Sequence, residues 1–469
     1  MRSERSTDTC SPIHARRFVE FDATRRPPDF DERIAVIDSV PRVVITGVGV
    51  VSPLSGGASQ LVDRLRSRQT GIRTLTQIPS NVLPISAGAE AIDFTGDIGD
   101  YGPMDKKLQR TIRKGSKVMC REIEMGVAAA QLAIADAKLS ADDRDPLRTG
   151  VIYGCDYIIS LPEEYADGIA NCIVDGKFDF KLWGGQGKPA INPLWLLKYL
   201  PNMPASHIAI YNDLRGPNNS ITIREASAGA AVGEAYSTLT RGHADALIVG
   251  ATGSRIHPLR TLHAALQENL ATDRDDPSTM SRPFAADRDG AVVGEGAGAM
   301  VLETLSHAQS RGATIIGEVL DSAASCVGHT TPHAIQTALA NVYRGATAGI
   351  DASTIGHIHA HGLSTERDDR AEAAAINTVF GSPSQSPPVT TIKGHIGNLG
   401  GGSGMVEMIA SLLSLGGQLP PIRNLKKVAD DCPIHAVTGD DTPAGDSFVS
   451  ANVTPQGQAA AVRIGKFRS

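Results

Sequence analysis

Hydrophobic and polar positions along the chain follow two patterns, which together predict an α/β protein. Short apolar runs rich in β-branched residues and glycine, such as RVVITGVGVV (42–51), are typical of strands buried on both faces. Longer segments with apolar residues three and four positions apart, such as REIEMGVAAAQLAIADAKL (121–139), predict helices. Strands that alternate with helices imply sheets that are covered by helices.

The same pattern returns in the second half of the chain. IGHIHAHGLST (355–365) predicts a strand that ends in a polar loop, and AEAAAINTVFG (371–381) predicts a helix. The segment that begins at PPVTTIKG (387–394) predicts a strand, a glycine-rich turn and a long helix. We therefore expect two similar α/β halves, at about 41–305 and 306–469, although one sequence does not prove an internal repeat.

Composition and charge exclude several classes of protein. The net charge of −6 provides no basic field for nucleic acid or anionic lipid. There is no uninterrupted run of about 18 apolar residues, so no transmembrane helix is expected. The 6 cysteines are scattered without CxxC pairs, which argues against a zinc site or a disulfide framework.

The N-terminal segment is predicted to be a polar arm over residues 1–40. It lacks the apolar core of a signal peptide, and it mixes acidic with basic residues, so a cytoplasmic location is expected. A Gly-, Pro- and Trp-rich stretch near 183–199 predicts an excursion on the substrate side or at an interface.

Polar residues gather at three predicted strand-to-loop transitions, which is where sites form in α/β proteins. The transitions are TIREASAG with Glu225, HAHGLSTERDDRAEA with His359, His361, Asp369 and Glu372, and TIKGHIGNLGGGSG with Lys393, His395 and Asn398. The stretch GNLGGGSG lacks the Lys-Ser/Thr ending of a phosphate-binding loop, and GEGAGA precedes a strand rather than a helix. No cofactor and no metal are therefore expected.

Five segments spread over the chain carry a family pattern. They are VVITGVGVVSPL, YNDLRGPNNSITI, SRPFAADRDGAVVGEGAGAMVLE, HAHGLST followed by D and AE, and KGHIGNLGGGSGMVE. In this order they resemble the β-ketoacyl-acyl-carrier-protein synthases, the elongating condensing enzymes of the thiolase superfamily. The resemblance runs from about Arg42 to the C-terminus. It implies the thiolase-type five-layered α/β/α/β/α fold with two similar halves, over residues 41–469.

Carried over position by position, the resemblance also implies where the site residues lie. The family's nucleophilic Cys falls on Glu225, its two catalytic His positions on His361 and Asn398, its supporting Lys on Lys393, and its acid pair on Asp369 and Glu372. The C-terminal loop that gates the acyl pocket in the family is replaced near NVTPQGQ (452–458).

Glu225 changes the chemistry that is expected of this site. A carboxylate does not form the stable thioester of the Cys-dependent route, so standard condensation is doubtful. Three roles stay open: a base, a neutral mimic of the Gln that related decarboxylating ketosynthases carry, or an inert cap at the helix start. An ionised Glu225 would repel a malonyl carboxylate by about 4 kcal/mol at ~4 Å with an effective dielectric of ~20.

The other site residues are interpreted as hydrogen-bond donors and their supports. His361 and Asn398 together resemble the His/Asn pair that stabilises an enolate in initiating condensing enzymes and thiolases; the alternative for His361 is a packed loop histidine. Lys393 is expected either in a buried pair with Glu372 or Asp369, or as a solvated surface lysine.

The resemblance implies a β-ketoacyl-synthase-like protein that acts on acyl-carrier-protein thioesters in fatty acid or polyketide-type biosynthesis. Two alternatives stay open: an enzyme with altered chemistry, such as decarboxylation or base-driven enolate formation, and a non-catalytic, chain-length-setting partner of an active ketosynthase. Because the family works as homodimers or paired heterodimers, a homodimer, or a heterodimer with a related ketosynthase, is expected.

Overall fold

The structure is a computed structural model that describes residues 40–54, 57–78, 83–328 and 332–468. Apart from Val40, the predicted polar arm lies outside the described residues. Residues 41–469 form one unit, and its elements are described below. Among the described residues, no helix is both long enough and apolar enough to cross a membrane.

The described strands of the main sheet hydrogen bond in the order β12-β11-β13-β14-β10-β1-β9-β8-β4-β7. The first five in the chain are β1 (Val43–Val51), β4 (Thr149–Cys155), β7 (Asn218–Thr222), β8 (Ala246–Ser254) and β9 (Glu295–Thr304). The second five are β10 (Gly317–Cys326), β11 (His357–His359), β12 (Val389–Thr390), β13 (Ser447–Val453) and β14 (Gln458–Gly465).

The two halves of this sheet have the same topology. Numbered along the chain within each half, the strands lie in the order third, second, fourth, fifth, first. In each half the second strand pairs parallel with the third and the fourth, while the fifth pairs antiparallel with its neighbours. The halves meet where β1 and β10 pair antiparallel. The expected two similar halves are confirmed.

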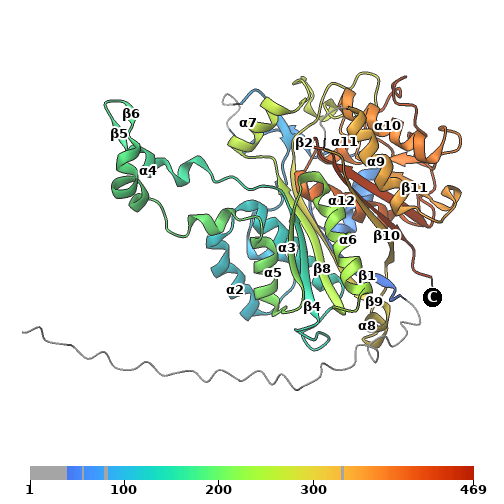
Figure 1. Cartoon of the computed structure of the whole chain (residues 1–469), viewed down its shortest axis with the longest axis horizontal. Coiled ribbons are helices and arrows are strands. Elements are labelled where there is room, and N and C mark those ends of the chain that lie inside the picture. Colours follow the sequence, from blue (N-terminus) through green and yellow to red (C-terminus); the bar gives the residue numbers. More distant parts are fainter. Residues whose placement is uncertain (1–39, 55–56, 79–82, 329–331, 469) are drawn as a thin grey trace, which may run out of the picture. The chain divides into compact units, whose positions relative to one another are not determined.

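Helices form three layers around the half-sheets (Figure 1). The outer layer of the first half contains α3 (Arg121–Asp136) and α5 (Met203–Asn212), and that of the second half contains α9 (Pro332–Ala346) and α10 (Glu366–Phe380). The central layer is made of α6 (Ser227–Thr240) and α12 (Ser403–Ser414), which contact strands of both halves. The five-layered α/β/α/β/α prediction agrees with this arrangement.

Shorter elements complete the described fold. They are α1 (Ala58–Arg66), β2 (Ile72–Thr74), β3 (Ala87–Ala89), α2 (Lys106–Gly115), α4 (Ala166–Ala170), β5 (Ile173–Val174), β6 (Lys177–Phe178), α7 (Pro258–Gln267), α8 (Leu305–Ser310) and α11 (Lys393–Ile396). The segment with α4, β5 and β6 extends away from the main sheet (Figure 1).

The main core lies between the two halves. All nine residues of β1 are buried, as expected of an apolar run with both faces covered. Ile45 of β1, Val232 of α6 and Met405 of α12 belong to one buried cluster. This cluster fixes the two central helices, whose N-terminal ends carry the candidate site.

Gly253, near the end of β8, lets the loop before α12 come close to the sheet. A Cβ atom at this position would lie 2.1 Å from the carbonyl oxygen of Leu399 and 2.8 Å from the backbone N of Gly401. Backbone atoms cannot give way as a flexible side chain can. Glycine therefore sets the distance between β8 and the loop that carries Asn398.

Replacing Gly253 with Ala is expected to lower the free energy of unfolding by about 2 kcal/mol or more, because the added methyl overpacks a rigid backbone contact. Chemical denaturation would measure the loss. Gly99→Ala is the matched control, since a Cβ there meets no atom within 4 Å. Equal stability of the two variants would contradict the close-approach argument.

Candidate active site

The predicted site residues lie just beyond the carboxyl ends of strands from both halves. β7 leads through a short 3-10 turn, Arg224–Ala226, into α6, and this turn contains Glu225. His361 follows β11, while Lys393 begins α11 after β12. Asn398 lies in the loop between α11 and α12. Equivalent strands of the two halves thus bring Glu225 and Asn398 toward each other.

Glu225 is held by three donors through a single carboxylate oxygen. Its Oε1 accepts a hydrogen bond from Nη1 of Arg255 at 2.8 Å and one from Nδ2 of Asn398 at 3.1 Å. Nη2 of Arg224 is the third donor, at 3.3 Å. The side chain is only 2% exposed. A carboxylate in such a place needs positive partners, and two arginines supply them.

Glu268 completes a network of four charges around Glu225. Its Oε1 accepts from Nη2 of Arg224, and its Oε2 accepts from Nη2 of Arg255, both at 2.6 Å. Glu268 caps the C-terminal end of α7. Two carboxylates and two guanidiniums make the network neutral as a whole, which allows it to be buried.

The electrostatics keep Glu225 ionised. Burial alone would raise the pKa of this carboxyl, but the guanidiniums of Arg224 and Arg255 outweigh burial and hold the pKa well below its usual range. A carboxylate with so low a pKa is a weak base, which disfavours the base role and the protonated mimic. Its charge is already compensated, so the expected repulsion of a malonyl carboxylate is largely removed.

His361 is buried as a neutral ring, and its surroundings select one tautomer. Burial, followed by the charge of Lys393, lowers the pKa of His361 to about 3. Its Nδ1 lies 3.2 Å from Nδ2 of Asn452 and 3.4 Å from Nζ of Lys393. Both neighbours are donors, so Nδ1 must accept, and the proton of the neutral ring is on Nε2. His361 therefore offers Nε2–H as a donor.

The amide of Asn452 is oriented by Glu407, since Nδ2 also donates to its Oε2 at 2.8 Å. The other oxygen of Glu407 forms a short ion pair with Nζ of Lys393. The expected pair of Lys393 with Glu372 or Asp369 is wrong, because α12 presents Glu407 directly to the ammonium group. The alternative of a solvated lysine is also wrong, since the Lys393 side chain is buried.

Asp369 and Glu372 hold the loop of His361 rather than the site itself. Glu372 accepts from the backbone N of His361 at 2.7 Å and of Gly362 at 2.8 Å. Asp369 accepts from the backbone N of Ser364 at 3.0 Å. Burial raises the pKa of each carboxyl to about 7. Both acids belong to α10, so this helix fixes the backbone of the loop that carries His361.

Asn398 is oriented by its own loop. Its Oδ1 accepts from the backbone N of Gly400 at 3.0 Å and from Oγ of Ser403 at 3.1 Å. These contacts turn Nδ2 toward Glu225 and leave the second hydrogen of the amide for a ligand oxygen. His361 and Asn398 are thus two neutral donors beside a fixed anion.

Sequence reasoning missed several residues of the site. Arg255 directly follows β8, so the same strand-end rule that found Glu225 would also have found it. Arg224 directly precedes Glu225 in the sequence, and its opposite charge could have indicated an ion pair between the two. Asn452 was considered only as the start of the replaced loop. Glu268 carries no sequence signal, because its partners are known only from the fold.

One cavity of about 310 Å³ lies beside this network. Glu268 lines it, together with Leu363 from the loop of His361 and Pro455 from the loop after Asn452. Thr365, Arg367 and Gln456 form other parts of its wall. The cavity is therefore bordered by the loops that follow His361 and Asn452, and Glu268 is the residue of the charge network that lines it.

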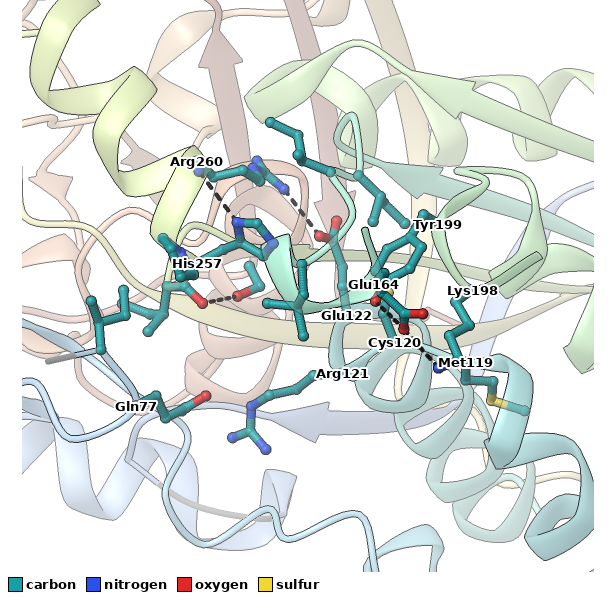
Figure 2. A pocket seen from close by; sticks show the side chains of 17 residues that line it. Gln77, Met119, Cys120, Arg121, Glu122, Glu164, Lys198, Tyr199, His257 and Arg260 are labelled. Atoms are coloured by element: carbon teal, nitrogen blue, oxygen red, sulfur yellow. Dashed lines mark hydrogen bonds and ion pairs between the residues drawn. The ribbon is translucent and has the colours of Figure 1, made fainter. Parts of the chain in front are cut away.

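A second cavity, of about 380 Å³, is lined by none of the sequence-predicted site residues (Figure 2). Nη1 of Arg260 contacts Glu122 at 3.0 Å within its wall. Burial raises the pKa of the Cys120 thiol to about 12, so this cysteine is not a thiolate. Lys198 and Tyr199 also line the cavity, which places the end of the predicted 183–199 excursion at its wall.

Metal ligation finds no support in the part of the chain that the structure describes. No group of three or more His, Cys, Asp or Glu residues there is arranged to hold a metal ion. Of the described cysteines, Cys155 is the one whose backbone contacts the start of α6, through Ser227. Burial raises the pKa of its thiol well above the usual value, so it is not a thiolate nucleophile at neutral pH.

Comparison with known proteins identifies the family. Residues 41–308 match the family model of the β-ketoacyl synthase N-terminal domain. This chain belongs to the β-ketoacyl synthase family. Residues 313–426 match the C-terminal domain of the same family.

Individual members of the β-ketoacyl synthase family agree with this assignment. The 3-oxoacyl-(acyl-carrier-protein) synthase 2 of Synechocystis is 31% identical over 409 residues, which cover 85% of this chain and 91% of the relative. A solved β-ketoacyl synthase from Burkholderia phymatum has a TM-score of 0.77 at 26% identity, covering 91% of this chain and 100% of that chain.

The solved ishigamide ketosynthase/chain length factor has a TM-score of 0.75 at 26% identity, and the match covers 92% of this chain and 100% of that chain. The fold is therefore that of the ketosynthases.

Replacing Glu225 with Gln is expected to lower the free energy of unfolding by about 3 kcal/mol at pH 7, because two buried guanidiniums then share one carboxylate. The depressed pKa of Glu225 means that its contribution is present above the ordinary Glu pKa and is lost as pH falls. The difference between the variant and the unchanged protein should therefore narrow below about pH 4.5.

Urea denaturation at pH 7 and pH 4 would measure this difference. Glu234→Gln is the matched control on α6, because Glu234 is exposed and should change stability by less than about 0.5 kcal/mol. A difference that stays constant with pH would refute an ionised, arginine-paired Glu225.

Proposed function

We propose that this member of the β-ketoacyl synthase family binds a malonyl-type thioester on an acyl carrier protein and decarboxylates it without forming an acyl-enzyme. The observation that carries the proposal is the fixed, arginine-paired Glu225 at the start of α6. A thiol at this place would accept an acyl chain, whereas a salt-bridged carboxylate does not. The name of the Synechocystis relative supports an acyl-carrier-protein thioester as ligand.

The two neutral donors would stabilise the enolate that forms during decarboxylation. Nε2–H of His361 and the free amide hydrogen of Asn398 would bind the thioester carbonyl oxygen. As the bond between the carboxylate and the α-carbon breaks, its electron pair forms an enolate whose oxygen these donors stabilise. Carbon dioxide leaves, and water supplies the proton that converts the enolate to an acetyl thioester. The product would serve fatty acid or polyketide-type biosynthesis.

A second function, that of a partner subunit for an active ketosynthase, is favoured by an open sheet edge. β7 is the last strand of the sheet, and all of its residues are exposed or partly exposed. An unpaired strand edge can pair with another chain. The likeness to the ishigamide ketosynthase/chain length factor supports this proposal. A dimer and a cytoplasmic location stay predictions.

Incubation of the purified full chain with malonyl-carrier protein, followed by intact-mass spectrometry, tests the main proposal. The carrier should lose carbon dioxide while the mass of the chain stays unchanged. His361→Ala should slow the loss by about 100-fold, because one of two oxyanion donors is removed. His243→Ala is the control, since His243 is exposed and lies outside the site.

An acyl adduct on the chain would refute the absence of an acyl-enzyme. The partner function would be favoured by two results together. The malonyl group on the carrier would keep its carboxylate, and ketone production would become faster or change when an active ketosynthase is added.

A further inference from the structure

Arg224 and Arg255 hold the carboxylate of Glu268 as they would hold the carboxylate of a ligand. Each oxygen of Glu268 faces a different guanidinium, at 2.6 Å in both cases. Charge-assisted contacts of this length are the strong ones, and arginine is the residue best suited to carboxylates. The arrangement is a carboxylate-binding geometry that a residue of the chain itself occupies.

Side-chain exposure differs among the members of the network. Arg255 is 5% exposed, Glu268 12% and Arg224 16%. Glu268 also lines the cavity of about 310 Å³, whereas Glu225 does not. Glu268 is thus the member of the network that lines this cavity. Of the two carboxylates in the network, Glu268 is the more exposed, at 12% against 2% for Glu225, so it is the one that can rotate toward solvent.

Arg224 has features that a purely structural ion pair does not require. Its φ of +53° lies in the left-handed region, which costs a non-glycine residue free energy and often marks functional sites. Its buried Nε has no hydrogen-bond partner among the described residues, and neither has Oε2 of Glu225. An unsatisfied Nε–H beside an occupied Nη2 is the donor pair that binds a carboxylate side-on.

We propose that Arg224 and Arg255 form a binding subsite for the free carboxylate of a small ligand, which Glu268 occupies in the unliganded protein and vacates when the ligand enters. The identity of the natural ligand as a malonyl-type thioester rests on the proposed function, but the subsite itself does not.

Exchange of one carboxylate for another conserves the charge of the site. The ligand carboxylate meets two guanidiniums, which compensate its repulsion by Glu225, while Glu268 regains water in the cavity. A ligand without a carboxylate would not displace Glu268 from the arginines, so it would gain no binding free energy at this subsite. Glu268 thus competes with every anionic ligand and selects against neutral ones.

Calorimetric titration of the full chain with malonate tests the subsite directly. Glu268→Gln removes the competing charge, so malonate should bind about tenfold more tightly than to the unchanged protein. Arg224→Met should abolish binding. Malonamide, which is neutral, should bind none of these proteins.

Asp431→Asn is the matched control, because Asp431 also bridges two arginines, Arg288 at 3.0 Å and Arg370 at 2.8 Å. This variant should leave malonate binding unchanged. Thermal unfolding of each variant, with and without malonate, provides a second measurement, since a bound ligand raises the melting temperature.

Equal malonate affinity with and without the Glu268 carboxylate would overturn the proposal, and so would binding that survives Arg224→Met. The binding assay needs no turnover. Malonate binding without loss of carbon dioxide from malonyl-carrier protein would refute only the proposed decarboxylation. Turnover that is unaffected by Arg224→Met would refute only the subsite.

Discussion

Buried charge is the constraint on which the site depends. The ends of strands from both half-sheets bring ionisable side chains into a region with almost no solvent, where each charge must be paired or neutralised. Glu225 is paired with two arginines, Lys393 with Glu407, and His361 is kept neutral. The positions of the hydrogen-bond donors follow from these pairings.

The pairings also divide the site into two groups of residues, one around the neutral His361 and one around the ionised Glu225. On one side, Lys393, Glu407 and Asn452 fix the ring of His361 and the position of its proton. On the other, the arginine network fixes a negative charge that neither moves nor accepts a proton near neutral pH. Asn398 contacts Glu225 directly. The chemistry left to such a site is stabilisation of a developing oxyanion rather than nucleophilic attack.

Much of the fold could be predicted from the sequence, because the hydrophobic period of each segment and the order of the motifs can be read directly from it. The buried run 42–51 became β1, and the periodic segment 121–139 became α3 with an end three residues earlier. Strand-end reasoning also located Glu225, His361 and Asn398. The partners of these residues could not be found in this way. Glu407 ends the motif KGHIGNLGGGSGMVE, but the motif does not show its pairing with Lys393, and Glu268, at a helix end, has no signal in the chain.

The error about Lys393 has the same origin. Glu372 and Asp369 follow the His361 loop closely in sequence, yet their carboxylates are taken up by backbone N–H groups of that loop. The ammonium group therefore meets the acid that the central layer presents. Glu407 is only 14 residues from Lys393 in the sequence, but the glycine-rich turn between them decides which acid meets the ammonium group, and the sequence pattern does not show how that turn folds.

The neutral network around Glu225 has an evolutionary consequence. A single change of Glu225 to a neutral residue would leave Arg224 and Arg255 with one carboxylate between them, so the variant sequence would carry an excess buried positive charge. Loss of either arginine alone would in turn leave Glu225 and Glu268 to share a single guanidinium. The four charges are thus interdependent, so that a lasting substitution at any one of them is expected to require a compensating change at another.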